Sequence, residues 1–353
     1  MQTLFSKYRK NLNHDEQVPV YGLCEGMTPL VRSHHIAGEL GANVNLFFKL
    51  ESRNPSFSFK DRGVSNVISQ ARLAGKIGVI CSTSGNLGVS CAMYAARSRM
   101  KSVILIPKLF VNEEKIKRMQ LHDAAIFVLD GDIFDGIKIG EEFAAKYNFE
   151  LVNYNNQYYQ QGLKTISFEV CDELGRVPDI FSCGIGHGTL MGSVWRGFKQ
   201  YYSSSMIDRL PVMMGFEACS SSSTKVSISK GYYHRSTILN EVSLGSKEIL
   251  DDAVIARDES SGYISSVTDE QTLAVYQTLA RKEAIIADVS SCISVAGLYK
   301  LKADGVDFDN QTIVCVLSGT SDSSEIMYVD LHGVSWLKVI KPFLSDLESE
   351  MVF

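Results

Sequence analysis

The fold prediction starts from the stretch Asn54-Pro55-Ser56-Phe57-Ser58-Phe59-Lys60-Asp61-Arg62-Gly63, which places a lysine ahead of a helical pattern. The Asn-Pro pair favours a turn, and two phenylalanines supply apolar cover before the lysine. After Gly63, apolar residues recur at helical spacing at Val64, Val67, Ile68 and Ala71. Lys60 is therefore predicted to lie where a helix begins, and the positive end of the helix dipole disfavours its protonated form there.

A lysine in such a place can act as a nucleophile toward an aldehyde. Only the neutral amine forms a Schiff base, and the unperturbed pKa of a lysine side chain lies several units above neutrality. Burial and nearby positive charge lower that pKa. The alternative is a solvated lysine that opens an amphipathic helix, which is the ordinary role of an arbitrary lysine.

The composition indicates a globular protein. The 353 residues, 45% of them hydrophobic, can bury a large core, and the length suggests two domains. The net charge of −5 leaves no basic stripe, so nucleic acid is not an expected partner. The polar residues 11–17 follow a basic N-terminus where a secretory signal would be apolar. No apolar run approaches membrane-spanning length, so we expect a cytoplasmic protein with no membrane partner.

The cysteines and histidines favour neither disulfides nor a metal site. None of the eight cysteines belongs to a CxxC pair, and most lie in apolar stretches: Cys24, Cys81, Cys91, Cys171, Cys183, Cys219, Cys292 and Cys315. This pattern predicts buried reduced thiols. The seven histidines form no HExxH motif, so no catalytic metal is predicted.

Short runs rich in β-branched residues alternate with longer stretches of helical period. The predicted strands are 78–81, 102–106, 125–129, 151–153, 180–183, 212–217 and 312–317. The predicted helices after the one at Lys60 are 87–100, 112–121, 133–147, 160–174, 190–202, 269–284 and 290–303. This alternation predicts an α/β fold with parallel sheets covered on both faces. The domain change is placed near the polar residues 154–160.

A second motif, Cys81-Ser82-Thr83-Ser84-Gly85-Asn86-Leu87-Gly88, follows a predicted strand and opens a helix. Free backbone N–H groups and small hydroxyls at such a place can bind a carboxylate or a phenolate oxygen. The alternative is a helix N-cap formed by Ser84 or Asn86.

A third motif, Ser182-Cys183-Gly184-Ile185-Gly186-His187-Gly188-Thr189, also lies between a strand and a helix. Its alternating glycines allow the backbone to approach a phosphate monoester closely. It is neither a P-loop nor a clean GxGxxG motif, and His187 could be a surface loop residue. A fourth motif, Val314–Thr320, is a buried strand that ends in a hydroxyl at Ser318.

Taken in order, these motifs resemble those of the fold-type II pyridoxal-phosphate enzymes, the tryptophan synthase beta-like superfamily. Among them the chain is most similar to the threonine synthases or a divergent threonine synthase-like member. The resemblance covers nearly the whole chain and rests on Glu25–Leu30, Lys49–Glu51, Asn54-Pro55, Ser58–Gly63, Ser84–Asn86, Gly162–Thr165 and the loop at Gly184. It implies pyridoxal 5′-phosphate in a cleft between two parallel-sheet α/β domains, a small amino-acid substrate and a homodimer. We assign residues 1–58 and 156–353 to a large cofactor-binding domain and residues 59–155 to a smaller domain.

The resemblance also implies which residues hold the cofactor. Lys60 would form the Schiff base and later move the α-proton of the substrate, and Phe59 would lie beside it. Asn86 would hold the 3-hydroxyl group, and Ser318 would face the pyridine nitrogen. The 5′-phosphate would lie in the loop made of Gly184, Ile185, Gly186, His187, Gly188 and Thr189.

The substrate-binding residues are implied in the same way. The α-carboxylate would lie against Ser82, Thr83, Ser84 and Gly85. Arg62 and Lys164 are candidates for binding a substrate phosphate or another anion, although either could instead belong to a structural ion pair, the more ordinary role for Lys164.

The hydroxyl of Ser318 bears on the chemistry. A hydroxyl does not stabilise a protonated pyridinium as a carboxylate does, so the ring is a weaker electron sink and loss of a β- or γ-substituent competes well with transamination. The resemblance therefore implies a lyase that converts O-phosphohomoserine and water to threonine and phosphate. Two alternatives remain: β-replacement or deamination of serine, threonine or O-phosphoserine, and a non-catalytic homologue that senses an amino acid.

The sequence departs from the family at several ligand-facing positions. Phe57 replaces a usual glycine and would be strained if its φ were positive. His187 stands where asparagines are usual. The family's Glu-Pro-Ser/Ala segment is here Ala287–Ser291, and the usual ending after the last strand is here Ser318–Ser324. The cofactor is thus better supported than the substrate.

Overall fold

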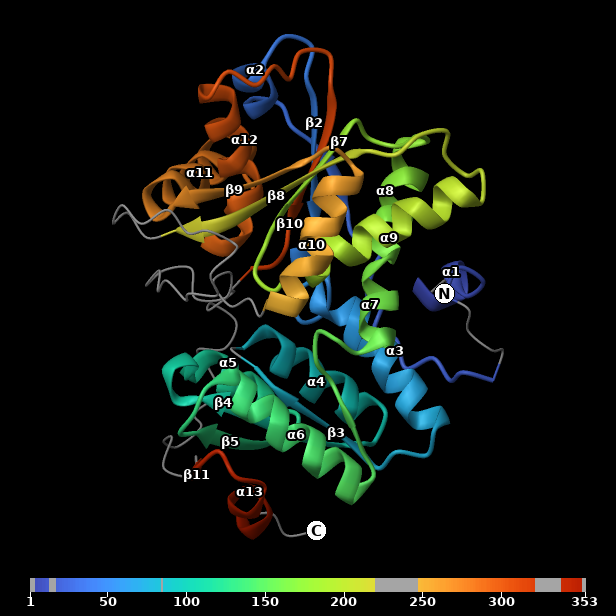
Figure 1. The fold of residues 1–353 in the computed structure, drawn as a ribbon, viewed down its shortest axis with the longest axis vertical. Helices are drawn as coiled ribbons and strands as arrows, with labels where there is room; N and C mark the ends of the chain where they lie inside the picture. The colour runs from blue at the N-terminus through green and yellow to red at the C-terminus, as the bar shows by residue number, and fades with distance from the viewer. Residues whose placement is uncertain (1–3, 13–16, 84, 220–246, 321–337, 351–353) are drawn as a thin grey trace. The chain divides into compact units, whose positions relative to one another are not determined.

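The computed structural model describes residues 4–12, 17–83, 85–219, 247–320 and 338–350, which belong to two compact units (Figure 1). The first unit consists of residues 1–25, 60–162 and 322–353, and the second of residues 26–59 and 163–321. The division predicted from the sequence placed both ends of the chain in the other unit. The C-terminal part differs because strand β11 (Lys338–Ile340) pairs with β5 (Ala125–Leu129) of the first unit.

The first unit is built on a five-stranded parallel sheet of order β11-β5-β4-β3-β6. Its other strands are β4 (Lys101–Pro107), β3 (Gly78–Ser82) and β6 (Phe149–Leu151). All residues of β3 are buried, as expected of a central parallel strand covered on both faces.

Helices cover both faces of this sheet. On one face, α6 (Ile133–Tyr147) and α13 (Leu344–Glu350) contribute Phe143 and Leu347 to a core with residues of β3, β4 and β5. On the other face lie α4 (Asn86–Arg97) and α5 (Glu113–Gln120), and Gly88 packs against Ile104 and Met119. The unit also contains α1 (Leu4–Tyr8), α3 (Lys60–Leu73), the 3-10 turn η2 (Lys108–Phe110) and most of α7 (Gln157–Leu163).

The second unit is built on a six-stranded sheet of order β1-β2-β10-β7-β8-β9. Only β1, at one edge, runs antiparallel to its neighbour among the described strands of this sheet. The strands are β1 (Leu30–Arg32), β2 (Asn45–Leu50), β10 (Thr312–Leu317), β7 (Ile180–Gly184), β8 (Val212–Cys219) and β9 (Tyr263–Thr268).

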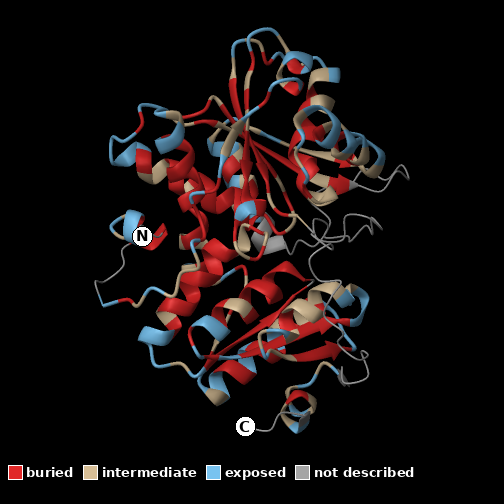
Figure 2. Cartoon of the chain, turned by 180° about the vertical axis from the view of Figure 1, so that it is seen from behind, coloured by how far each residue is buried: buried red, intermediate tan, exposed pale blue. Residues whose placement is uncertain are grey.

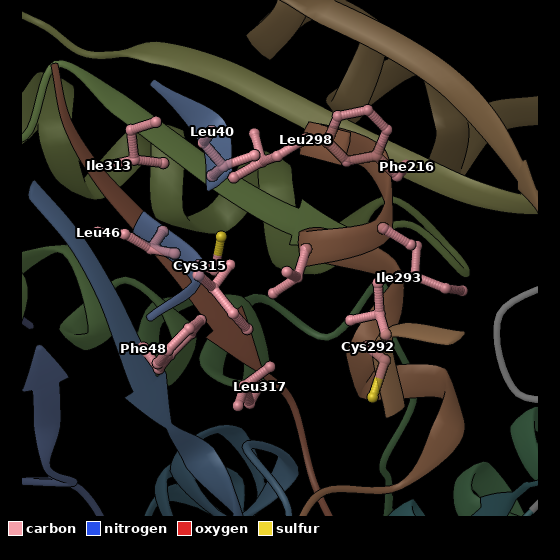
Figure 3. Packing of buried hydrophobic residues seen from close by; sticks show 14 of the residues in the cluster. Leu40, Leu46, Phe48, Phe216, Cys292, Ile293, Leu298, Ile313, Cys315 and Leu317 are labelled. Atoms are coloured by element: carbon pink, nitrogen blue, oxygen red, sulfur yellow. The ribbon is translucent and has the colours of Figure 1, made fainter. Parts of the chain in front are cut away.

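This sheet is also covered on both faces. Helices α2 (Ile36–Leu40), α11 (Asp269–Glu283) and α12 (Ile293–Ala303) pack on one face. There Leu40 of α2 and Leu298 of α12 share a core with strand residues such as Phe216 of β8 (Figure 3). On the other, α9 (Thr189–Ser203) packs Phe198 against Phe181 of β7, with ring centroids 5.4 Å apart. Helices α8 (Thr165–Leu174) and α10 (Lys247–Glu259) pack against α9, and 3-10 turns lie at η1 (Glu51–Arg53) and η5 (Val289–Cys292). Figure 2 shows the strands of both units as largely buried.

The predicted α/β fold with parallel sheets is confirmed, and three elements have the predicted bounds: β5, α6 and β10. The helix predicted over residues 160–174 is instead two helices. Both the N–H and the Oγ of Ser167 donate to the Lys164 carbonyl, and this bond to the third residue back interrupts the α-helical pattern.

Strand β2 was not predicted because it carries a lysine in an apolar run. Lys49 is fully buried, and its Nζ lies 3.0 Å from a carboxylate oxygen of Glu169 and 2.6 Å from the Thr28 carbonyl. Glu169 also accepts from the Met27 N–H at 2.6 Å. A buried ion pair with further hydrogen bonds thus anchors the segment before β1 to α8.

The described cysteine side chains are unbridged, and those other than the exposed Cys24 are buried. Burial raises the pKa of Cys171 and of Cys183 to about 12, so these thiols remain protonated near neutral pH. The Cys219 side chain lies outside the described part of the structure. No helix in the described residues has the length and hydropathy needed to cross a membrane.

The segment before Lys60 is held against the end of β10. Phe57 adopts a left-handed conformation, with φ of 67°, and its carbonyl accepts from the Thr320 N–H at 3.0 Å. Ser58 and Gly319 form an antiparallel bridge, and the Phe59 N–H donates to the Ser318 carbonyl at 3.0 Å. The positive φ that would strain a phenylalanine is therefore present, and the hydrogen bonds on both sides of it hold that conformation.

Replacing Phe57 tests this strain. Phe57→Gly and Phe57→Ala both remove the ring, but only glycine adopts a positive φ at no steric cost, so the glycine variant should be more stable by about 1 kcal/mol. Urea unfolding of both variants measures the difference. At an ordinary position alanine is the more stable of the two, so an alanine variant equal to or better than glycine would contradict the strain.

A second stability test concerns the contact between α12 and β8. A Cβ on Gly297 would lie 2.1 Å from the Phe216 ring, so Gly297→Ala should destabilise the protein by about 1–3 kcal/mol through overpacking. The control is Gly38→Ala in α2, where a Cβ would meet no heavy atom within 4 Å and should be neutral or stabilising. Thermal unfolding compares the two, and equal effects would refute the packing argument.

Candidate functional site

In the first unit, Lys60 and Asn86 each begin a helix, and the two helices are neighbours. The Ser90 hydroxyl in α4 donates to Oδ1 of Asp61 in α3 at 2.5 Å, which joins the two helices near their N-termini. Lys60 is half-buried and Asn86 is buried. The structure therefore brings the predicted Schiff-base lysine and the residue predicted to hold the 3-hydroxyl group to adjacent helix N-termini, where an anion or a phenolate is favoured.

The loop between β3 and α4 has the features of a small anion site. The Gly85 N–H donates to Oγ1 of Thr83 at 2.9 Å, and Gly85 has a φ of 151° that side chains rarely adopt. The Ser82 hydroxyl is buried and has no hydrogen-bond partner among the described residues. Ser84, the other predicted member, lies outside the described residues. The Ser82 oxygen is turned toward α6, because a Cβ on Gly136 would lie 2.3 Å from it. The start of α4 is therefore the part of this loop that fits a negatively charged ligand group.

Lys115 of α5 lies across this loop and was missed by the sequence analysis. A Cβ on Gly85 would lie 2.5 Å from Cδ and 2.9 Å from Nζ of Lys115. The lysine lies in the charged run Glu113–Arg118, where nothing distinguishes it from its neighbours, so only the fold could identify it. It brings a cation to the same loop.

Arg62, predicted to bind the substrate, is fully buried. Tyr94 lies among the same charged residues. Burial and the carboxylates of Asp61 and Glu25 raise its pKa well above the usual value, while the positive charge of Arg62 lowers it. The Tyr94 hydroxyl donates to Glu25 at 3.0 Å. Arg62 thus belongs to a buried charged cluster, which gives it a structural role. Its role toward a substrate stays a prediction.

Lys164, the other candidate for binding an anion, is largely buried in the second unit. Its Nζ donates to Oε1 of Gln200 at 2.7 Å, an amide and not a carboxylate. Burial, and then the nearby charge of Arg196, lower the pKa of Lys164 to about 8.

In the second unit, the glycine loop and Ser318 follow two adjacent parallel strands. Residue Cys315 of β10 lies opposite Ser182 of β7, so both loops emerge at the same edge of the sheet. This edge is where ligands bind in open parallel sheets. Two predicted groups of cofactor-binding residues are therefore brought together in this unit.

The glycine loop fits a phosphate group. Gly188, with φ of 80°, is the N-cap of the long helix α9, and the buried Thr189 hydroxyl has no hydrogen-bond partner among the described residues. Ile185 is fixed by its N–H bond to the Phe216 carbonyl at 2.7 Å. His187 is 9% exposed, so the alternative of a surface loop residue was wrong. Backbone donors, an unsatisfied hydroxyl and a helix N-terminus are what a phosphate monoester requires.

Ser318 follows the last residue of β10 and is half-buried. Its Oγ lies 3.1 Å from Oγ of Ser291, a residue of η5 that the sequence analysis did not assign to the site.

The chain is similar to known proteins over nearly its whole length. The chain is 35% identical over 350 residues to a threonine synthase of Synechocystis sp., an alignment that covers 99% of this chain and 91% of the relative. It is 34% identical over 316 residues to a threonine synthase of Halalkalibacterium halodurans, with 90% of this chain and 88% of the relative covered. These similarities support a lyase that depends on pyridoxal phosphate.

Solved structures show the same fold. The processed form of threonine deaminase isoform 2 from Solanum lycopersicum superposes with a TM-score of 0.70 at 20% identity, covering 91% of this chain and 90% of that one. A family described as pyridoxal-phosphate dependent enzymes matches residues 22–319. That range includes Lys60, Asn86, the glycine loop and Ser318. The chain belongs to the family of pyridoxal-phosphate dependent enzymes.

Proposed function

We propose that the chain is a threonine synthase that converts O-phosphohomoserine and water to threonine and phosphate. The observation that carries the proposal is its similarity to threonine synthases over 99% of its length, in a chain that keeps Lys60 at the start of a helix. The fold neighbours support the fold alone, because they are only about a fifth identical in sequence.

The reaction exchanges one substituent for another on neighbouring carbons. At the γ-carbon, the bond to the phosphate oxygen breaks and a C–H bond forms. At the β-carbon, a C–H bond breaks and the hydroxyl of water is added, while the remaining proton of water goes to the released phosphate. Pyridoxal phosphate supplies the electron sink that stabilises negative charge next to the amino group. The protein must then hold the substrate and move protons between specific atoms.

Lys60 is assigned to hold the cofactor and to move the proton of the α-carbon. Its place at the N-terminus of α3 favours the neutral amine that both tasks require. The Ser82–Asn86 loop would hold the α-carboxylate through the backbone N–H groups at the start of α4. Lys115 would add a positive charge to that loop.

Residues of the second unit are assigned to other groups of the cofactor. The loop Gly184–Thr189 would bind the 5′-phosphate through the start of α9 and the Thr189 hydroxyl. Ser318 would face the pyridine nitrogen with a neutral group, which favours elimination and replacement over transamination. A cytoplasmic location and a homodimer stay predictions.

The activity test uses the protein reconstituted with pyridoxal phosphate. It should form threonine and phosphate in equal amounts from O-phosphohomoserine, and Lys60→Ala should reduce the rate by about a thousandfold or more. The matched control is Lys76→Ala, beyond the end of the same helix, which should keep the rate.

Three results would contradict the proposal. Ammonia and a 2-oxo acid released from serine or threonine, with no phosphate from O-phosphohomoserine, would indicate the deaminase alternative. Release of phosphate from O-phosphoserine with replacement at its β-carbon would indicate a β-replacement enzyme. If Lys60→Ala binds its amino acid as tightly as the unaltered chain and neither turns it over, the protein is a sensor.

Lys115 can be tested through the affinity for substrate. Lys115→Met should raise KM for O-phosphohomoserine about tenfold while kcat changes little, because the lost charge interacts with the bound substrate and the transition state alike. The control is Lys117→Met on the same helix, because residues two apart do not share a face. Equal KM values for the two variants would remove Lys115 from the site.

A further inference from the structure

The hydroxyl of Ser291 makes a set of contacts around Ser318 that the proposed function does not use. Ser291 is 2% exposed, and its Oγ accepts from the Gly319 N–H at 2.8 Å. The same oxygen lies 2.9 Å from the Gly319 carbonyl and 3.1 Å from Oγ of Ser318. Its single proton can therefore go to either of two acceptors.

The Gly319 carbonyl does not depend on that proton. It already accepts from the Asp288 N–H at 3.1 Å. Ser318 is different, because a hydroxyl that donates its own proton to a ring nitrogen can still accept one in return. If Ser318 donates to the pyridine nitrogen, the proton of Ser291 has Ser318 Oγ as its acceptor. The two hydroxyls then form a chain of hydrogen bonds, in which Ser291 donates to Ser318 and Ser318 donates to the ring nitrogen.

Ser291 is itself fixed by the turn that carries it. Its N–H donates to Oδ1 of Asp288 at 2.7 Å, and the Ser290 hydroxyl donates to the same oxygen at 2.9 Å. Asp288 is the N-cap of η5, so the backbone of Ser291 is held on one side by a carboxylate and its side chain on the other by Gly319. The Ser291 hydroxyl has little freedom to turn away from Ser318.

We propose that Ser291 is a positioning residue that holds the Ser318 hydroxyl as a hydrogen-bond donor to the pyridine nitrogen of the cofactor. The inference rests on the proposed placement of Ser318. It explains why a serine can serve at that position, since an isolated hydroxyl could rotate to donate elsewhere. The pair keeps the ring nitrogen unprotonated, which suits elimination and replacement.

The test reads the ring nitrogen directly. The protein is loaded with pyridoxal phosphate labelled at the pyridine nitrogen, and nitrogen NMR reports the hydrogen bond to it. Ser291→Ala should move the resonance in the same direction as Ser318→Ala. It should also weaken cofactor binding about threefold to tenfold in a fluorescence titration, as expected for the loss of one hydrogen bond.

A double variant separates positioning from general stability. In Ser318→Ala/Ser291→Ala the resonance and the affinity should equal those of Ser318→Ala alone, because Ser291 acts through Ser318. Ser291→Thr keeps the hydroxyl and should keep the resonance. The matched control is Ser167→Ala, which removes another fully buried hydroxyl that donates to a carbonyl, that of Lys164 at 2.7 Å, and should leave the nitrogen signal in place.

The outcomes are distinguishable. A resonance that Ser318→Ala moves and Ser291→Ala leaves in place overturns this inference and leaves the proposed function standing. A resonance that neither variant moves, or a signal of a protonated ring nitrogen in the unaltered protein, overturns the placement of Ser318 as donor together with the inference. A shift of the resonance in Ser167→Ala as well would mean that the effect is only structural.

Discussion

The short antiparallel contact between the segment before Lys60 and the end of β10 is the constraint on which the candidate site depends. The Thr320 N–H, the Phe59 N–H and the Ser58–Gly319 bridge fix two loops to each other within the second unit. Ser318, assigned to the ring nitrogen, is the first residue after β10. Phe59 is the residue before Lys60, which is assigned to the Schiff base. Holding Phe57 at a positive φ is the cost of this contact.

The parallel sheets supply the rest of the arrangement. Because β7 and β10 are neighbours and run the same way, the glycine loop and Ser318 must leave the sheet at one edge. In the first unit the Asp61–Ser90 bond joins α3 and α4 near their N-termini, so Lys60 and Asn86 both begin helices that lie against each other. The order of the strands places the glycine loop beside Ser318, and the packing of α3 on α4 places Lys60 near the start of α4.

The sequence predicted those helices and strands that are determined by residues within the same segment, such as a helix cap or an apolar pattern. Residues 133–147 form one helix with the predicted bounds because Asp132 caps it and an apolar stripe follows. Residues 312–317 form a fully buried strand, as an unbroken apolar run suggests. Strand β2 was missed because the charge on Lys49 is compensated by Glu169, far away in the sequence. Lys115 and Ser291 were missed for the same reason, since their importance comes from Gly85 and Gly319, which only the fold brings near.

Residues 287–291, which differ from the family pattern, form the turn that holds Ser291 beside Ser318. A carboxylate near a pyridine nitrogen would be expected to stabilise the protonated ring, and Asp288 lies close enough that its Oδ2 would be 3.3 Å from a Cβ on Gly319. Its Oδ1, however, accepts from the Ser291 N–H and the Ser290 hydroxyl, so the charge is used to cap η5. The acid thereby fixes the backbone that presents Ser291, and the group left to face Ser318 is a neutral hydroxyl. The polarity of the position assigned to the ring nitrogen is thus set by a carboxylate that acts as a helix cap.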